Sequence, residues 1–302
     1  MRKLQALGSR LGAPGPGPPP GTEHKYENRA TVPASIENRP GDLPRPVGGM
    51  VSESGRMAVH AKLEIAVQDA AGARIALENG ADRVELCTAL GLGGLTPTLG
   101  TIEAVVAVGI GVHVLIRPRG GGYTYTPAEV ELMAGDITHA AQAGAAGIVI
   151  GALAEGDAAL DLEVLATLVA AAHLVNQDIE ITVHRCVDVL LENGLPIAEL
   201  VAQLRTVGAH RILTSGGAPA SGAGAETLHR LRTEAAGNPQ IQAGGGVRIE
   251  DIPALASLDG IHLSARTQTT RGASGPGGGE SAFDVTSAEL VSAAAAALAA
   301  CR

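Results

Sequence analysis

Residues 79–86 read N-G-A-D-R-V-E-L, and related phrases occur at residues 142–150 (Q-A-G-A-A-G-I-V-I), 207–214 (V-G-A-H-R-I-L-T) and 258–264 (L-D-G-I-H-L-S). In each phrase a glycine stands next to the start of a short apolar run. Glycine readily adopts the left-handed conformation that ends many helices, so the phrases mark points at which a helix stops and a strand begins. Their recurrence indicates a fold built from one repeated helix–strand unit.

Short apolar runs alternate with helix-length amphipathic segments from residue 59 onward, which is the pattern of a parallel sheet with helical connections. Eight such units over residues 59–302 match the length of a (β/α)8 TIM-type barrel. A doubly wound open sheet is the alternative, but no G-x-G-x-x-G motif follows the first run, where a dinucleotide-binding fold carries it. We therefore predict the α/β class, with a single barrel domain over residues 59–302. The predicted strands are residues 62–67, 83–87, 113–118, 147–151, 179–185, 211–215, 241–243 with an extension to 247, and 260–265.

Residues 1–58 have a different composition, with the run G-A-P-G-P-G-P-P-P-G at residues 12–21. Such a segment buries too little apolar surface to offset its chain entropy, which predicts a disordered extension. A translation start at Met57, which opens M-A-V-H-A-K-L-E-I, is the alternative to a real tail. Residues 8–20 are rich in Gly and Pro where an export signal carries an apolar stretch, so export is not expected.

The composition excludes several classes of partner. Aromatic residues make up 1 % of the chain and the net charge is -9, so we expect no nucleic acid to bind. Charged residues interrupt the longer apolar stretches, so we expect no membrane span. Three widely separated cysteines without a C-x-x-C motif are typical of a reducing compartment, which predicts a cytoplasmic protein.

Polar residues at the carboxyl ends of the predicted strands are the candidates for function, because barrels of this type place their active sites there. Glu64 and Glu85 stand in otherwise apolar strands, and a buried carboxylate needs a cation or hydrogen-bond donors. Alternation puts Arg117 at the end of the third strand, where it could clamp Glu64, Glu85 or an anionic ligand. A charge network that only braces the barrel interior is the alternative for all three residues.

Two histidines end strands in a similar way. His184 lies at the end of the fifth strand, and Asp188 in the following turn could orient its imidazole for general base catalysis or metal binding. His262 and Ser264 share a face of the eighth strand and form a second such cluster. A hydrogen-bonded packing role is the alternative for each histidine.

Glycine-rich turns follow the sixth and seventh strands. Ser215 and Gly216 belong to T-S-G-G, and Gly244, Gly245 and Gly246 belong to A-G-G-G-V-R. Barrels often bind phosphate through glycines after late strands, so both turns are predicted anion-binding sites, with plain tight turns as the alternative.

In order, the chain carries L-E-I (63–65), G-A-D-R-V-E-L-C (80–87), G-G-L-T-P-T-L-G (93–100), I-R-P-R-G-G (116–121), H-R-C-V-D (184–188), R-I-L-T-S-G (211–216), A-G-G-G-V (243–247) and H-L-S-A-R (262–266). Together these motifs resemble the CutC family of copper homeostasis proteins over about residues 60–302. The resemblance implies a TIM-type barrel, a cytoplasmic location, self-association into a homo-oligomer and copper binding. By match to these motifs, the resemblance implies a family mouth made of Glu64, Glu85, Arg117, Arg119, His184, Arg185, Asp188, Ser215 and His262. Arg119 and Ser264 are expected to help the glycine-rich turns bind an anion.

The resemblance assigns the metal role to Cys87, which matches the family's E-L-C thiol and would bind Cu(I), since Cu(I) prefers thiolate and thioether ligands. The chain departs from the family at Ala66 and Leu263, where members often carry cysteine, and at Cys186, where they usually carry alanine. An enzyme of lyase or isomerase type, acting on a small anionic or phosphorylated metabolite, is the alternative function, and an interaction scaffold is a third. Residues 267–281 are rich in Gly and Ser, which predicts a mobile cover over the reactive end.

Overall fold

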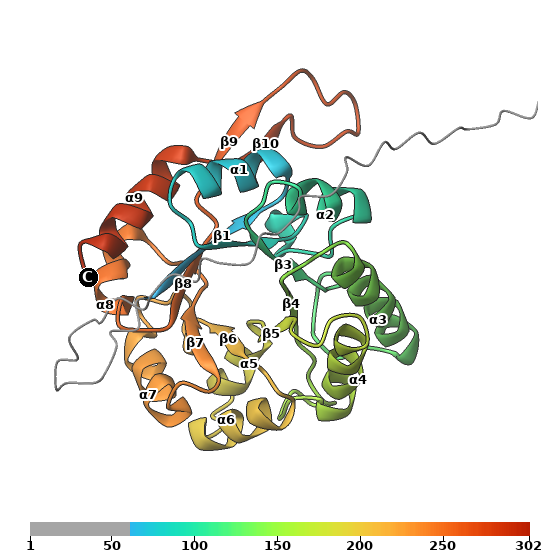
Figure 1. The fold of residues 1–302 in the computed structure, drawn as a ribbon, viewed down its shortest axis with the longest axis vertical. Helices are drawn as coiled ribbons and strands as arrows, with labels where there is room; N and C mark the ends of the chain where they lie inside the picture. Colours follow the sequence, from blue (N-terminus) through green and yellow to red (C-terminus); the bar gives the residue numbers. More distant parts are fainter. Residues whose placement is uncertain (1–60) are drawn as a thin grey trace, which may run out of the picture. The chain divides into compact units, whose positions relative to one another are not determined.

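The computed structural model describes residues 61–302, and these residues form a closed barrel of eight parallel strands in sequence order (Figure 1). The predicted fold is therefore confirmed, and the open-sheet alternative is wrong. The barrel strands are β1 (Lys62–Val67), β2 (Arg83–Leu86), β3 (Gly111–Leu115), β4 (Gly147–Ile150), β5 (Glu180–Val183), β6 (Arg211–Thr214), β7 (Gln240–Ala243) and β8 (Gly260–Leu263). Three predictions concern residues outside the described range. They are the start of the barrel domain at residue 59, the disordered extension over residues 1–58 and the translation start at Met57.

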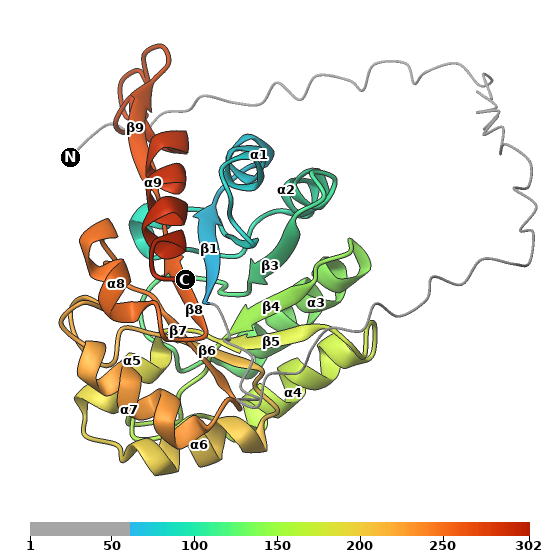
Figure 2. The same cartoon turned by 60° about the vertical axis from the view of Figure 1, so that its left-hand side comes forward.

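Helices surround the strands as an outer ring (Figures 1 and 2). Several begin where a side-chain oxygen accepts a hydrogen bond from a free N–H of the first turn, as Asp69, Thr98, Thr126 and Asp161 do. The α-helices are α1 (Ala70–Glu78), α2 (Leu99–Val106), α3 (Pro127–Gln142), α4 (Leu162–His173), α5 (Cys186–Glu192), α6 (Ile197–Thr206), α7 (Ala225–Ala235), α8 (Ile252–Leu255) and α9 (Ala288–Ala299), and the short 3₁₀ turns are η1 (Leu90–Leu92) and η2 (Ile249–Asp251).

The junction glycines behave as the repeated phrase predicts. Gly80, Gly144 and Gly208 follow α1, α3 and α6 with φ angles of 92°, 94° and 70°. Gly260, in the fourth phrase, is instead the first residue of β8 and has no positive φ. Three of the four phrases therefore end a helix through glycine, and the fourth starts a strand.

Alternation along each strand divides the apolar side chains into two groups. Ile65, Val84 and Val114 pack with the helices in the main hydrophobic cluster. Cys87, Leu115 and Val149 form a separate small cluster. Because successive side chains of a strand point to opposite faces, the second group lies inside the barrel together with Glu64, Glu85 and Arg117. The polar strand residues therefore share the inside of the barrel.

A β-hairpin follows β8 where the sequence predicts a mobile cover. Strands β9 (Arg266–Thr270) and β10 (Ala282–Thr286) pair antiparallel, and β10 packs on α1. Figure 1 shows the hairpin extending outward beyond α1, away from the centre of the barrel. The prediction of a mobile cover over residues 267–281 is wrong at residues 267–270, which belong to β9, whereas β10 begins just beyond the predicted segment. Alternating β-branched residues such as Thr267, Thr269 and Val285 support the pairing on either side of the Gly-rich loop.

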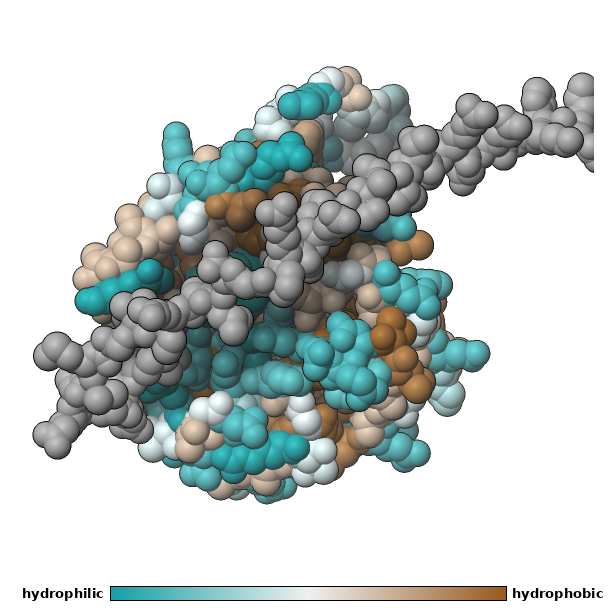
Figure 3. All heavy atoms as spheres, in the orientation of Figure 1, coloured by the Kyte–Doolittle hydropathy of each residue, from teal (hydrophilic) through white to brown (hydrophobic). Residues whose placement is uncertain are grey.

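The outer surface is mostly hydrophilic in the view of Figure 3, with apolar side chains in separate patches. The exposed large apolar residues are scattered over different elements and include Leu77, Leu99, Leu132, Leu174 and Phe283. Within residues 61–302, no helix combines the length and the apolar character that crossing a bilayer requires.

Candidate functional site

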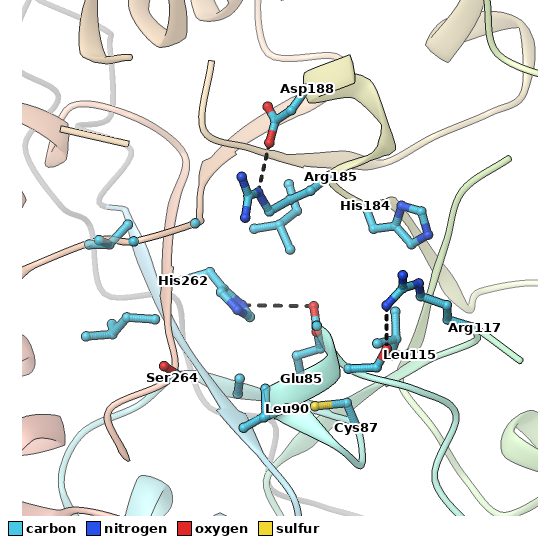
Figure 4. Close-up of a pocket in the computed structure, with 18 of the residues that line it drawn as sticks. Glu85, Cys87, Leu90, Leu115, Arg117, His184, Arg185, Asp188, His262 and Ser264 are labelled. Atoms are coloured by element: carbon cyan, nitrogen blue, oxygen red, sulfur yellow. Dashed lines mark hydrogen bonds and ion pairs between the residues drawn. The ribbon is translucent and has the colours of Figure 1, made fainter. Parts of the chain in front are cut away.

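A cavity of about 570 Å³ opens at the carboxyl ends of the strands (Figure 4). Most of the predicted site residues line it, namely Glu85, Cys87, Arg117, His184, Asp188, Gly245, Gly246, His262 and Ser264. The remaining predicted residues do not line it, namely Glu64, Arg119, Ser215, Gly216 and Gly244. The topology therefore gathers residues from β2, β3, β5, β7 and β8 around one volume.

Glu64 lies below this cavity in a closed network of hydrogen bonds. Its Oε2 accepts from Nε of Arg83 at 2.5 Å, and its Oε1 accepts from Nε2 of Gln242 at 2.5 Å. Nδ1 of His262 lies 2.8 Å from the same Oε1. Burial alone would raise the pKa of Glu64, but Arg83 and His262 outweigh it and hold the pKa well below its usual range. Glu64 is therefore an ionised carboxylate that supports His262.

Glu85 has the opposite electrostatic behaviour. Its residue is 6 % exposed, and Oε2 is buried without a hydrogen-bond partner among the described residues. Burial raises the pKa of Glu85 to about 7, with the charge of Glu64 adding to the effect and His262 opposing it. Nδ1 of His262 lies 4.0 Å from Oε2 of Glu85, and the two carboxylates raise the pKa of His262 despite its burial. The mouth thus holds a carboxyl whose pKa is raised to about 7 beside an imidazole whose pKa is also raised.

His184 is a neutral imidazole. Its Nδ1 accepts a hydrogen bond from the backbone N–H of Cys186 at 3.2 Å, so the ring proton is on Nε2, which is buried without a partner in residues 61–302. Burial, with the charge of Arg117 nearby, lowers the pKa of His184 to about 3. The ring lies 4.9 Å from that of Tyr123. His184 is therefore suited to donate a hydrogen bond and not to act as a base at neutral pH.

Asp188 does not orient His184, which corrects the sequence-based expectation. Its carboxylate accepts from Nε of Arg185 at 2.8 Å and from the hydroxyl groups of Thr214 and Ser215 at 2.5 and 3.0 Å. Backbone N–H groups of Ser215 and Gly217 also donate to it, at 3.0 and 3.2 Å. Asp188 is the third residue of α5, so its side chain lies away from the face of β5 that His184 occupies. It binds the turn after β6 instead.

The turn after β6 is also a correction to the predicted anion site. The N–H groups of Ser215 and Gly217 bind Asp188, and the N–H of Gly216 donates to Oγ1 of Thr214 at 2.9 Å. These are the donors that an anion would need. Since the protein's own carboxylate occupies the turn, Ser215 and Gly216 have a structural role in this arrangement.

Arg117 reaches the cavity but contacts neither Glu64 nor Glu85. The predicted clamp on these two carboxylates is therefore wrong, and the predicted contact with an anionic ligand stays a prediction. Its guanidinium donates to the carbonyl oxygens of Leu92, Gly94 and Gly121 at 3.2, 3.0 and 2.9 Å. It lies over the Tyr123 ring, with Cζ 5.4 Å from the centroid. No carboxylate forms an ion pair with Arg117 in residues 61–302. A cation held only by carbonyl groups keeps its attraction for an anionic ligand.

Arg119 turns away from the site. Its Nε donates to Oε1 of Glu129 at 2.5 Å, and Glu129 also accepts from the backbone N–H of Thr126 at the start of α3. Arg119 therefore braces the capping box of α3, and it is not among the residues that line the cavity. Its predicted anion-binding role has no support in this geometry.

The turn after β7 differs from the turn after β6. The N–H of Gly244 donates to the carbonyl of Thr214 at 2.9 Å, whereas the N–H groups of Gly245 and Gly246 have no acceptor within residues 61–302. Gly245 and Gly246 have φ angles of 104° and 62°, which side chains rarely adopt. Both line the cavity, as does Ser264 beyond β8. Within the described residues, this turn therefore has two N–H groups that the fold itself does not use.

A metal ion can be tested against the residues present. Glu64, Glu85 and His262 offer ligand atoms within 4.8 Å of one another, and this is the one such group in the described part of the chain. Carboxylate and imidazole ligands suit harder ions than Cu(I), and Arg83 already neutralises Glu64. Cys87 lies on the cavity wall, but burial and the charge of Glu85 raise the pKa of its thiol. The lining therefore supplies a single soft donor, in protonated form, and it fits Cu(I) poorly by itself.

Sequence reasoning missed three residues of the site. Arg83 and Gln242 complete the network around Glu64, and Tyr123 packs between Arg117 and His184. Arg83 stands two residues before Glu85, so the alternation that places Glu85 inside the barrel also places Arg83 there. That signal was present in the sequence. Tyr123 lies in a loop, and no periodicity indicates its position.

Sequence comparisons find relatives of this chain in one family. The model of the CutC family matches residues 61–269. The family protein CutC of Agrobacterium fabrum is 40 % identical over 205 residues, which cover 67 % of this chain and 78 % of that protein. The family protein CutC of Xylella fastidiosa (strain Temecula1) is 38 % identical over 215 residues, which cover 70 % and 77 %.

Two solved structures show the same fold. The putative copper homeostasis protein CutC from Streptococcus agalactiae superposes with a TM-score of 0.60 at 26 % identity, covering 68 % of this chain and 98 % of that chain. A putative phosphonomutase from Burkholderia cenocepacia superposes with a TM-score of 0.50 at 19 % identity, covering 67 % and 86 %. The second likeness concerns the fold alone.

Proposed function

The chain belongs to the CutC family, and from this premise we propose that its barrel mouth binds a small anionic molecule and carries out acid–base chemistry on it. The observation that carries the proposal is Glu85, a buried carboxyl with a raised pKa that lines the cavity and whose Oε2 has no hydrogen-bond partner within residues 61–302. Perturbed titratable groups in a concave site are a physical signature of catalysis. The class of reaction is that of a lyase or an isomerase, in which a proton moves between enzyme and substrate without hydrolysis.

Glu85 is the proton donor or acceptor of this proposal. A group whose pKa lies near the working pH has both protonation states available, which is the condition for efficient general acid–base catalysis. His262 is the second proton-exchanging group, and Glu64 positions it through the 2.8 Å contact to Nδ1. Placing His262 and Glu85 4.0 Å apart lets a proton pass between them when a substrate atom or a water bridges the gap.

Arg117 and His184 form the anion-binding side of the same proposal. Arg117 supplies a full positive charge, and the neutral His184 supplies an N–H without a partner among residues 61–302. Leaving a buried donor unsatisfied costs roughly 1–3 kcal/mol, so a ligand oxygen brought against Nε2 of His184 would recover that free energy. Tyr123 packs against both side chains and fixes their relative position.

A thermal-shift screen of anionic metabolites tests the proposal. A ligand at about 100 times its dissociation constant stabilises the native state by about 2.7 kcal/mol, which is a measurable rise in Tm. We expect the rise to disappear in Arg117→Gln and to persist in Arg119→Gln, whose side chain does not line the cavity. A hit that survives in Arg117→Gln, or a screen without hits, would count against the mouth as an anion site.

Binding of Cu(I) as cargo is the second candidate function. It rests on the name of the Streptococcus agalactiae structure and on the position of Cys87 in the cavity wall. With one soft donor in the lining, the remaining ligands must come from His262, Glu85 or a second copy of the chain in a homo-oligomer. A cytoplasmic location suits both candidates, since thiols stay reduced there.

An anaerobic titration with Cu(I) against a competing chelator separates the two candidates. Cys87→Ala should abolish binding, and Cys186→Ala is the matched control because Cys186 is equally buried but does not line the cavity. Equal weak binding by the wild type and both variants would remove copper from the function of this site.

A further inference from the structure

Arg185 is a second fixed cation at the mouth. It directly precedes α5, and its Nε donates to Oδ2 of Asp188 at 2.8 Å while Nη2 donates to Oγ of Ser215 at 3.2 Å. Nη1 has no acceptor within residues 61–302. In Figure 4, Arg185 lies well apart from Arg117, on the side of the cavity where His262 stands. The mouth therefore has two separated positive groups.

The turn after β7 is shaped around Arg185. A Cβ atom on Gly245 would lie 2.4 Å from Cζ and 2.7 Å from Nη1 of Arg185, so a side chain there would displace the guanidinium, and the φ angle of 104° also favours glycine. Gly245 and Gly246 carry the unpartnered N–H groups described above. Arg185 and the pair Gly245–Gly246, far apart in the sequence, thus line one cavity, and three of their donors, Nη1 and two backbone N–H groups, have no acceptor within residues 61–302.

A simple surface ion pair between Arg185 and Asp188 is the competing explanation, since the two residues are three positions apart and the Arg185 side chain is 42 % exposed. Asp188, however, also accepts from Thr214, Ser215 and Gly217. Those neutral donors already satisfy most of its lone pairs, so the carboxylate positions Arg185 and leaves Nη1 available. A plain ion pair needs neither this anchoring nor a glycine opposite the guanidinium.

We infer that Arg185 and the N–H groups of Gly245 and Gly246 form a second anion-binding subsite, so that the ligand of the mouth is a small molecule with two anionic groups. One group, a carboxylate or a phosphate, binds at Arg117 and His184, and the other binds at Arg185. The carbon atoms between them then lie beside Glu85 and His262. This inference rests on the proposed function, because it names the substrate class of the same site.

Calorimetric titration with simple anions tests the subsite. The probes are acetate with one carboxylate, the dicarboxylates malonate, succinate and glutarate in order of length, and phosphoglycolate with one phosphate and one carboxylate. We expect the best two-ended probe to bind the wild type at least about tenfold more tightly than acetate, equivalent to about 1.4 kcal/mol. Phosphoglycolate exceeding every dicarboxylate would identify phosphate as one of the two groups.

Variants assign the effect to the subsite. Arg185→Gln should reduce the advantage of the two-ended probe to about twofold or less while leaving acetate affinity unchanged, and Arg185→Lys should restore part of it. Glu192 lines the same cavity without an ion pair among residues 61–302, so Glu192→Gln should strengthen binding of the two-ended probe. Circular dichroism confirms that each variant is folded.

The outcomes separate this inference from the proposed function. If acetate binds and depends on Arg117 but no two-ended probe binds better, the subsite is overturned and the proposed function stands. The same holds if Arg185→Gln weakens acetate and the two-ended probe equally. If no probe binds at all, both fail together.

Discussion

Glu64 of β1 and Arg83 of β2 face each other at paired positions of neighbouring strands, and Oε2 of Glu64 accepts from Nε of Arg83 at 2.5 Å. Their side chains are 2 % and 10 % exposed. On the other side of β1, Glu64 is paired in register with His262. Glu64, Arg83 and His262 therefore form one layer of the barrel at the floor of the cavity. In this layer the buried Glu64–Arg83 pair sets the orientation and the charge of the His262 imidazole.

Removing Arg83 should destabilise the barrel strongly. Arg83→Met leaves a buried carboxylate without its cation, and breaking such a pair from one side costs about 3–5 kcal/mol. The free energy of unfolding in urea measures this. Lys62→Met is the control, because the exposed pair of Lys62 with Asp82 at 3.1 Å should be worth less than about 1 kcal/mol. Equal effects of the two substitutions would contradict the importance of the buried pair.

Glu85 should make stability depend on pH. Since its pKa is raised to about 7 in the folded state, the native protein holds the proton more tightly than the unfolded chain. The stability linked to this group is therefore complete below about pH 4.5 and is lost as the pH rises through about 7. Glu85→Gln should gain stability over the wild type between pH 5 and pH 8, by up to about 3 kcal/mol.

Unfolding free energies of the wild type and Glu85→Gln across this pH range check the prediction. Glu103→Gln, an exposed substitution on α2, serves as the control for a glutamate outside the cavity. A stability difference for Glu85→Gln that does not change with pH would mean that Glu85 titrates like a solvated carboxyl.

His184 and His262 should behave differently in nitrogen NMR spectra. Because the pKa of His184 is lowered to about 3, its ring should stay neutral, with the proton on Nε2, from pH 8 down to pH 5. The pKa of His262 is raised, so its ring should still be charged at pH 6.5. His184→Asn and His262→Asn assign the signals. A His184 signal that titrates near pH 6.5 would remove its role as a neutral hydrogen-bond donor.

The three cysteines should differ in reactivity. Cys87 and Cys186 are 1 % and 0 % exposed, and burial raises the pKa of both thiols, whereas Cys301 is exposed. Because the thiolate is the reactive form, a disulfide reagent should modify Cys301 alone in the native protein and all three thiols after denaturation. Cys301→Ser should abolish the fast phase. Fast labelling that persists in this variant would show that one of the two buried thiols is accessible, and its loss in Cys87→Ala would assign it to Cys87.

Gly151 should tolerate no side chain. A Cβ atom there would lie 2.2 Å from Cε1 of His184 and 2.6 Å from Sγ of Cys186. Gly151→Ala should therefore destabilise the protein by about 1–3 kcal/mol and weaken anion binding by displacing His184. Gly91→Ala is the matched control, since nothing lies within 4 Å of its Cβ position, and its effect should stay within about 0.5 kcal/mol. Anion binding that survives in Gly151→Ala would show that His184 is dispensable.

The sequence alone determined the barrel. Each parallel β/α unit has a local sequence signal, namely a glycine that ends a helix and a short apolar run that follows it. Gly80, Gly144 and Gly208 could therefore be recognised from the sequence without coordinates. Alternation within a strand is also local, and it correctly placed Glu85, Arg117, His184 and His262 on the inner face. The closed ring then brought these strand ends to one mouth.

Only the tertiary structure decided which side chains meet. Glu64 pairs with Arg83 and not with Arg117, and Asp188 binds the turn after β6 and not His184. Such choices depend on the register between strands and on the reach of each loop, which relate residues up to 198 positions apart, as in the contact of Glu64 with His262. Local sequence carries no record of these distances. Strand alternation predicts which carboxylates are buried, and a buried carboxylate needs a partner. The closure of the barrel decides which partner is close enough to bind it.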